Sequence, residues 1–169
     1  MRHPVCSVLL LLILICLCAC TPDLSILAYQ NEALHLFVSF DRGGVEVAGE
    51  ATLGKGGEGR DILFTLTSPS MLSGTVYGYE NGAYFARTGD TTIPLTECPD
   101  ILLPFSLFAI PLTSEVTGVE KVDTERVVTL THEHTIYTLT FSGDNPIPTI
   151  LTKETPTTRT TLRVTEVVS

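Results

Sequence analysis

Two zones of contrasting hydrophobic pattern divide the chain. Between Val5 and Cys20 every residue except Ser7 is apolar, and none is charged. Beyond residue 20, apolar and polar residues alternate within short segments that are rich in Thr, Val and other strand-favouring residues. Alternation with a period of two is typical of a strand with one buried face. The pattern therefore predicts an apolar leader followed by a mainly β domain.

Segment 45–53 shows the alternation most clearly. One face has Val45, Val47, Ala51 and Leu53, whereas Glu46 and Glu50 share the other. The dipeptide Asn81-Gly82 is the strongest hairpin signal in the chain, because both residues tolerate the left-handed backbone of a tight turn. About eight to ten antiparallel strands of this kind predict an open, unclosed β-barrel or a strongly curved sheet. The predicted strands cover residues 33–40, 45–53, 60–68, 74–80, 83–87, 91–95, 125–131, 135–141, 148–153 and 161–167.

A dense apolar stretch between prolines, residues 99–111, interrupts the strands. We predict a short helix that covers the concave face of the sheet. We place Pro99 near the first turn of this helix. Pro104 has no backbone N–H, so the alternative is that the helix begins only at that residue. Residues 24–31 are expected to form a short helix or an extended arm. The insert either fills the core or lines a pocket for an apolar ligand. The candidate lining residues are Ile101, Leu102, Phe105 and Phe108.

The apolar leader has the order of a secretory signal, with Arg2 before a run of Leu and Ile. At about 16 residues it is short for a spanning helix, which needs roughly 20. The sequence Leu17-Cys18-Ala19-Cys20 resembles the lipobox of bacterial lipoproteins. This resemblance implies cleavage after Ala19, a lipid on the thiol of Cys20 and an exported protein anchored in the bacterial envelope. The alternatives are an uncleaved membrane anchor and an ordinary signal with incidental cysteines.

The leader divides the chain into a signal peptide, residues 1–19, a lipidated tether, residues 20–32, and one domain, residues 33–169. Five cysteines are present, but Cys98 is the only one beyond residue 20. An intramolecular disulfide is therefore excluded once the leader is removed and Cys20 is acylated. The membrane, reached through the Cys20 lipid, is the first expected partner.

The charge of the chain and its reactive residue types argue against nucleic-acid binding, a metal site and catalysis. With 19 acidic and 10 basic residues the chain carries a net charge of -9 and no basic cluster, which disfavours nucleic acid as a partner. His132 and His134 flank Glu133, but two ligands do not complete a zinc site, and a polar hairpin tip explains them equally well. No Gly-x-Ser-x-Gly elbow is present. We therefore predict no catalytic residues, no metal ligands and no cofactor, with a hydrolase that uses His132 or His134 as a remote alternative.

The order of these segments resembles the superfamily of lipoprotein-carrier domains of the LolA and LolB type. The resemblance implies an unclosed antiparallel barrel with helices over an apolar interior. It favours a non-enzymatic envelope lipoprotein that binds or carries an apolar ligand such as lipid. The alternative is a domain with a filled core that binds another envelope protein. The segments that carry the resemblance are 34–40, 66–74, the Tyr-rich hairpin around residue 81, the insert 101–110 and 144–150.

Overall fold

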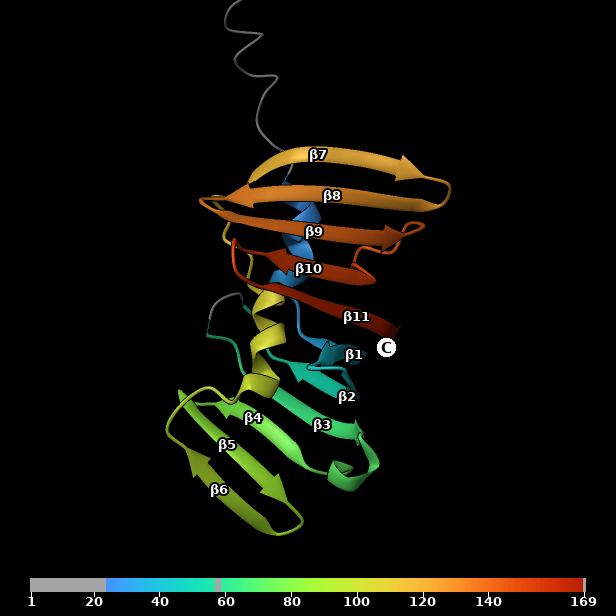
Figure 1. Ribbon diagram of the computed structural model, residues 1–169. Helices are drawn as coiled ribbons and strands as arrows, with labels where there is room; N and C mark the ends of the chain where they lie inside the picture. The colour runs from blue at the N-terminus through green and yellow to red at the C-terminus, as the bar shows by residue number, and fades with distance from the viewer. Residues whose placement is uncertain (1–23, 57–58, 169) are drawn as a thin grey trace, which may run out of the picture.

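A computed structural model describes residues 24–56 and 59–168 of the chain. Its described residues form one antiparallel sheet of 11 strands in the order β6-β5-β4-β3-β2-β1-β11-β10-β9-β8-β7 (Figure 1). The end strands β6 and β7 do not pair with each other, so the sheet stays open. The predicted mainly β, unclosed fold is confirmed. The strands are β1 (Leu34–Arg42), β2 (Val45–Leu53), β3 (Ile62–Ser68), β4 (Val76–Glu80), β5 (Ala83–Thr88), β6 (Thr91–Leu95), β7 (Glu115–Val122), β8 (Glu125–His132), β9 (Thr135–Ser142), β10 (Ile150–Glu154) and β11 (Arg159–Val167).

The strand order follows from two meanders that meet at the middle of the sheet. Strands β1 to β6 pair with their neighbours along the chain, and so do β7 to β11. The pairing of β1 with β11 joins the two halves, with Val38 opposite Val164. Short turns make such hairpins the simplest connections, and Asn81 and Gly82 both adopt positive φ angles in the β4–β5 turn. The predicted hairpin at this position is confirmed.

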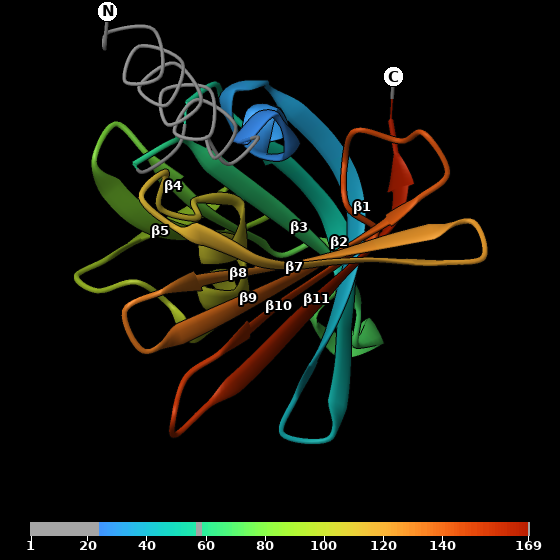
Figure 2. The same ribbon diagram turned by 90° about the horizontal axis from the view of Figure 1, so that it is seen from above.

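The sheet is strongly twisted. Seen from above, strands β7 to β11 cross the direction of β1 to β3 at a steep angle (Figure 2). The register shifts at three places, where Thr67 of β3, Thr117 of β7 and Thr165 of β11 are each an extra residue relative to the partner strand. A bulge bends its strand and increases the local twist, which helps to make one face of the sheet concave.

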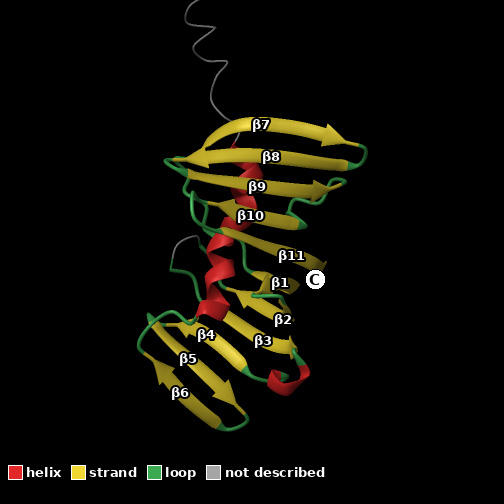
Figure 3. Cartoon of the chain, in the orientation of Figure 1, coloured by secondary structure: helices red, strands yellow, loops and turns green. Residues whose placement is uncertain are grey.

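Two 3₁₀ helices cover this concave face, η1 (Leu24–Asn31) and η3 (Asp100–Phe108). They lie one after the other, transverse to the strands (Figure 3). A short third helix, η2 (Ser70–Leu72), follows β3. The Tyr29 ring meets the Phe108 ring edge to face at 6.2 Å, so η1 and η3 are packed against each other. Within the described residues, no helix is both long enough and apolar enough to cross a bilayer.

A single hydrophobic core lies between the helices and the sheet. In β1 the inward residues from Leu34 to Phe40 are buried at every second position, as the alternation predicts. Leu27 and Tyr29 of η1 belong to the same core. The buried side chains of η3 are Ile101, Leu102, Pro104, Phe105, Leu107 and Phe108.

The helical insert begins at Asp100, directly after Pro99, so the expected start near Pro99 is confirmed. The alternative start at Pro104 is wrong, because Pro104 lies inside the helix. The ring of proline imposes a φ near −65°, which lies within the range of a 3₁₀ helix. Strand β7 was not expected at all. It is an edge strand whose residues are mostly exposed, so its hydrophobic alternation is weak.

Candidate functional site

An open cleft of about 460 Å³ lies between η3 and strands β3 to β5. We call it the apolar cleft. Its size is within the range of small-molecule sites. It is open to solvent on one side and does not extend through the core, where aromatic rings are packed together. The lining residues are Gly59, Arg60, Ile62, Tyr79, Tyr84, Cys98, Leu102, Leu103, Phe105, Ser106 and Ala109.

The three-residue period of η3 explains how the helix lines this cleft, since side chains three apart are aligned in a 3₁₀ helix. Leu102 and Phe105 are buried and form its floor, whereas Leu103 and Ser106 are exposed at its mouth. The remaining row, which includes Ile101, points into the core. Two residues from each of two rows, Leu102 with Phe105 and Leu103 with Ser106, therefore line the cleft.

The four residues that the sequence nominates as an apolar lining are thus divided. Leu102 and Phe105 line the apolar cleft, whereas Ile101 and Phe108 do not. Phe108 is fully buried against Tyr29. Ile101 is also buried in the core. The insert therefore fills the core and also forms one wall of the cleft.

The opposite wall comes from the sheet. Ile62 starts β3, and the Tyr79 and Tyr84 rings face each other across the β4–β5 hairpin with centroids 4.7 Å apart. Burial, together with the nearby Cys98 thiol, raises the pKa of Tyr84 above its usual value. The Cys98 thiol itself donates to the backbone oxygen of Pro99 at 3.7 Å. At neutral pH this wall is therefore uncharged and largely aromatic.

Arg60 is the one charged side chain among the described residues that line the apolar cleft. It is only 6% exposed. Its Nη1 donates to the backbone oxygen of Gln30 at 3.2 Å, and its Nη2 donates to that of Glu32 at 2.6 Å. The Nε atom is buried and has no hydrogen-bond partner. Burial lowers the pKa of the Arg60 guanidinium, and the nearby Tyr29 acts in the opposite direction.

Sequence reasoning missed Arg60, and no local signal marks it. The residue follows a glycine-rich loop and precedes a strand, where an exposed arginine is common. Its burial arises from the end of η1, which lies about 30 residues earlier in the chain. Only the folded chain brings these segments together.

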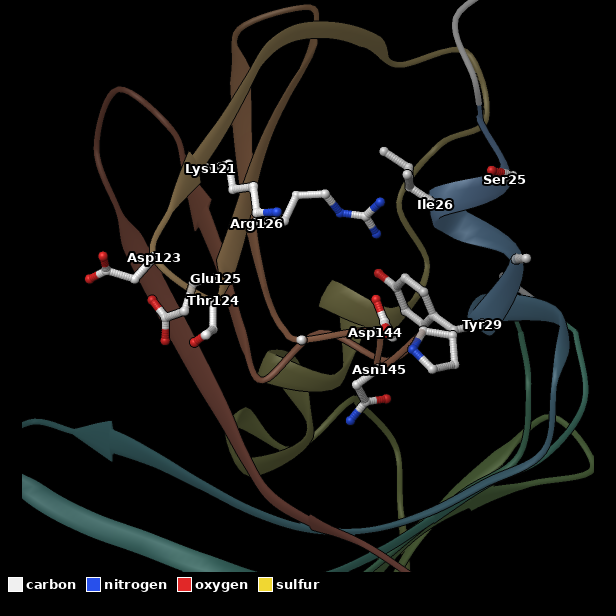
Figure 4. A pocket seen from close by; sticks show the side chains of 13 residues that line it. Ser25, Ile26, Tyr29, Lys121, Asp123, Thr124, Glu125, Arg126, Asp144 and Asn145 are labelled. Atoms are coloured by element: carbon white, nitrogen blue, oxygen red, sulfur yellow. The ribbon is translucent and has the colours of Figure 1, made fainter.

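A second cleft, of about 580 Å³, lies between η1 and the β7–β8 and β9–β10 turns. Figure 4 shows Tyr29 and Arg126 pointing toward one another across it. The Tyr29 hydroxyl is buried without a hydrogen-bond partner, and burial raises the pKa of Tyr29. Arg126 also stacks on the Phe141 ring at 4.7 Å. Acidic and basic side chains are mixed around this cleft, so its charge favours no particular ligand class. The lining residues are Ser25, Ile26, Ala28, Tyr29, Lys121, Asp123, Thr124, Glu125, Arg126, Gly143, Asp144, Asn145 and Pro146.

The three histidines in the part of the chain that the structure describes lie apart from both clefts. His132 ends β8 and contacts the Thr113 hydroxyl at 3.3 Å, while His134 lies in the β8–β9 turn. His35 on β1 contacts the Glu50 carboxylate on β2. Across residues 24–56 and 59–168, no three His, Cys, Asp or Glu side chains are grouped in a way that could hold a metal ion. The expected lipid-attachment residue Cys20 and the cleavage residue Ala19 lie outside the described residues.

No protein-family model and no curated protein matches the chain. Solved structures with some similarity include a LolA superfamily protein of Nitrosomonas europaea, with 12% identity, a TM-score of 0.49 and coverage of 87% of this chain and 93% of that one. The Mycobacterium tuberculosis lipoprotein LppX has 10% identity, a TM-score of 0.43 and coverage of 86% and 96%. A hypothetical protein of Chlamydia trachomatis has 12% identity, a TM-score of 0.47 and coverage of 85% and 90%. Membership of a family does not follow from these values.

Proposed function

We propose that this chain is an exported, lipid-anchored protein of the bacterial envelope whose domain binds an apolar ligand in the apolar cleft. The observation that carries the proposal is the cleft itself, which has ten uncharged lining residues and a single arginine. The function is one of binding or carrying, because the cleft holds no nucleophile with an adjacent base.

The side chains of the cleft have apolar surface that a ligand can still cover. Leu103 is 51% exposed, and Ile62, Tyr79 and Tyr84 are only partly buried. Each Å² of apolar surface removed from water contributes about 25 cal/mol to binding. An alkyl chain laid along this groove would cover Leu103 from outside and contact the buried Phe105 beneath it. The ligand would thus lie beside the filled core and not within it.

The lipobox-like sequence supports anchoring at Cys20. Helix η1 begins at Leu24, and its Leu27 and Tyr29 are buried in the core. The four residues from Cys20 to Leu24 span at most about 14 Å when fully extended. A lipid on Cys20 would therefore hold the domain close to the membrane surface, within reach of its lipids.

The anchor is tested by growth with radiolabelled palmitate and separation of membranes from soluble protein. Wild-type protein is expected in the membrane with label attached. Cys20→Ala is expected to lose the label, and Cys98→Ala serves as the matched control that keeps it. Label that persists in Cys20→Ala would refute lipidation at this residue.

The cleft is tested with the mature protein in nanodiscs and a neutral photoreactive probe, a hexadecanol that carries a diazirine. We expect saturable crosslinks to residues 98–109. Leu103→Glu places a charge at the mouth of the cleft and should abolish them. Leu112→Glu is the matched control, since Leu112 is 64% exposed and does not line the cleft. Equal labelling of the two variants would mean that the probe contacts the surface only.

A second candidate function is a domain that binds another envelope protein. Two observations favour it: the core is filled with aromatic side chains, and the edge strand β7 exposes Val119 and Val122. An exposed edge strand can pair with a strand of a partner. Failure of the neutral probe to enter the cleft, together with loss of a copurifying envelope protein in Val119→Lys, would favour this function.

A further inference from the structure

Arg60 has the chemistry of an anion-binding residue in an otherwise apolar cleft. A guanidinium has five N–H donors and stays charged at any physiological pH. Two of its nitrogens donate to backbone carbonyls, and the buried Nε has no acceptor. Backbone carbonyls carry partial charges only, so the full positive charge has no anionic counterpart there. Buried charges in proteins are normally paired, because an unpaired one loses its hydration without compensation.

The acidic side chains closest in sequence do not supply this counterpart. Asp61, the next residue, accepts a hydrogen bond from the backbone N of Asn81 at 3.3 Å and is exposed. Glu32 contacts Arg60 only through its backbone oxygen, and its side chain is exposed. Among the described residues, the ion pairs join His35 to Glu50 and Arg42 to Asp100, and neither includes Arg60.

The two backbone hydrogen bonds alone do not explain why residue 60 is an arginine. The two backbone bonds fasten the end of η1 to the start of β3, and an amide or an ammonium group could make similar bonds. A guanidinium also has more N–H donors than these two bonds use, and its planar form suits carboxylate and phosphate. Every other lining residue is uncharged, so the cleft combines one anion-binding group with an apolar groove.

We propose that the apolar cleft binds an amphiphile with an anionic head, a carboxylate or a phosphate, which pairs with the guanidinium of Arg60. The alkyl chain of the amphiphile lies over Leu103 and Phe105. This inference rests on the proposed function, because it names the ligand class of the same cleft. It adds the requirement that the ligand carries a negative charge at one end.

The test compares three photoreactive probes with the same 16-carbon chain, an alcohol, a carboxylate and a phosphate, on the mature protein in nanodiscs. We expect the carboxylate or the phosphate to label the cleft at a concentration at least about tenfold lower than the alcohol, as a charge-assisted hydrogen bond predicts. Whichever acid is preferred identifies the head group. Equal half-saturation for all three probes would overturn the role of Arg60.

The alcohol separates the two proposals. If the alcohol and both acids fail to label residues 98–109, the cleft does not bind alkyl chains and the proposed function fails. If all three probes label equally, the cleft binds alkyl chains without distinguishing their head groups. In that case only the inference about Arg60 fails. This comparison uses the wild-type protein and does not depend on the folding of any variant.

Variants of Arg60 then test whether this residue causes the preference for the acidic probes over the alcohol. Arg60→Met should remove the preference for the acid while labelling by the alcohol continues, and Arg60→Lys should retain part of the preference because it keeps the charge. Circular dichroism shows which variants fold. If Arg60→Met unfolds, the lysine variant still tests the assignment: a reduced preference for the acid supports it, and an unchanged preference overturns it. A wild-type preference that survives in folded Arg60→Met would refute the assignment.

Discussion

The rings of Phe64 on β3 and Phe105 on η3 pack with their centroids 5.0 Å apart and their planes tilted by 58°. Phe40 on β1 extends the cluster, with its ring 5.9 Å from that of Phe64. These contacts fasten η3 to the concave face of the sheet and fill the space that a more open barrel would leave empty. The remaining space lies beside Phe105, between η3 and the β4–β5 hairpin, and forms the apolar cleft.

This packing predicts that Phe105→Ala strongly destabilises the protein. Phe105 is 2% exposed, and removal of a buried phenyl ring costs about 3–5 kcal/mol in free energy of unfolding. Urea denaturation followed by circular dichroism is the appropriate measurement, because the chain contains no tryptophan. Leu103→Ala, on the exposed row of the same helix, should cost less than about 1 kcal/mol. A similar loss in both variants would mean that η3 is not held by its buried row.

The close approach of β2 and β3 at Gly49 predicts that a side chain at this position would destabilise the protein. A Cβ atom added to Gly49 would lie 2.2 Å from the backbone oxygen of Thr65 and 2.8 Å from Cε2 of Phe64. The backbone of β3 would have to move, so we expect Gly49→Ala to lower the melting temperature clearly, with a cost of at least about 1–3 kcal/mol. Gly118→Ala is the matched control, since its Cβ would meet Thr129 at an ordinary 3.6 Å. Equal melting temperatures for the two variants would contradict the close approach of β2 and β3.

The hydrophobic pattern predicts the sheet well because burial on one face imposes a period of two on every central strand. Segment 45–53 matches β2 at both ends for this reason. The pattern fails at β7, where an edge strand has little buried surface. It is also ambiguous at η3, since a pattern of apolar residues does not distinguish a 3₁₀ helix from an α-helix, and the two prolines allow a start near Pro99 or at Pro104.

The site was predictable only in part. The apolar composition of the insert indicates that it covers the concave face of the sheet. Which residues then face the core, as Ile101 does, and which line the cleft, as Leu102 does, depends on the three-residue period of the helix. Arg60 could not be identified at all, because its burial is created by Gln30 and Glu32, which lie far away in the sequence. Local patterns do not carry such long-range contacts.

An exposed ion pair at the start of η3, between Arg42 and Asp100, is expected to contribute little to the free energy of unfolding. The Nη2 of Arg42 donates to Oδ2 of Asp100 at 2.5 Å, and both side chains are about half exposed or more. Exposed ion pairs contribute about 0–1 kcal/mol and are screened by salt. Asp100→Asn should therefore lower the free energy of unfolding by less than about 1 kcal/mol at low salt. The difference should shrink at 1 M NaCl, and a loss that is larger or independent of salt would show that Asp100 acts mainly by another contact.

Cys98 offers a direct report on occupancy of the apolar cleft. It lines the cleft and is partly buried, and it is the only cysteine beyond residue 20. A ligand that covers Leu103 and Tyr84 would also cover the path by which iodoacetamide reaches the Cys98 thiol. We expect alkylation of Cys98, measured by mass spectrometry of the mature protein in nanodiscs, to slow several-fold when hexadecanol is added.

Protection of Cys98 must be separated from a general effect of the added alcohol on the membrane or on the reagent. Met71→Cys in a Cys98→Ser background places the thiol on η2, where Met71 is 86% exposed and does not line the cleft. Alkylation of this thiol should not change with hexadecanol. In Leu103→Glu, Cys98 should stay equally reactive with and without the alcohol, because the charge at the mouth excludes the chain. If the alcohol slows both thiols alike, or neither, then an alkyl chain does not occupy the cleft beside Cys98.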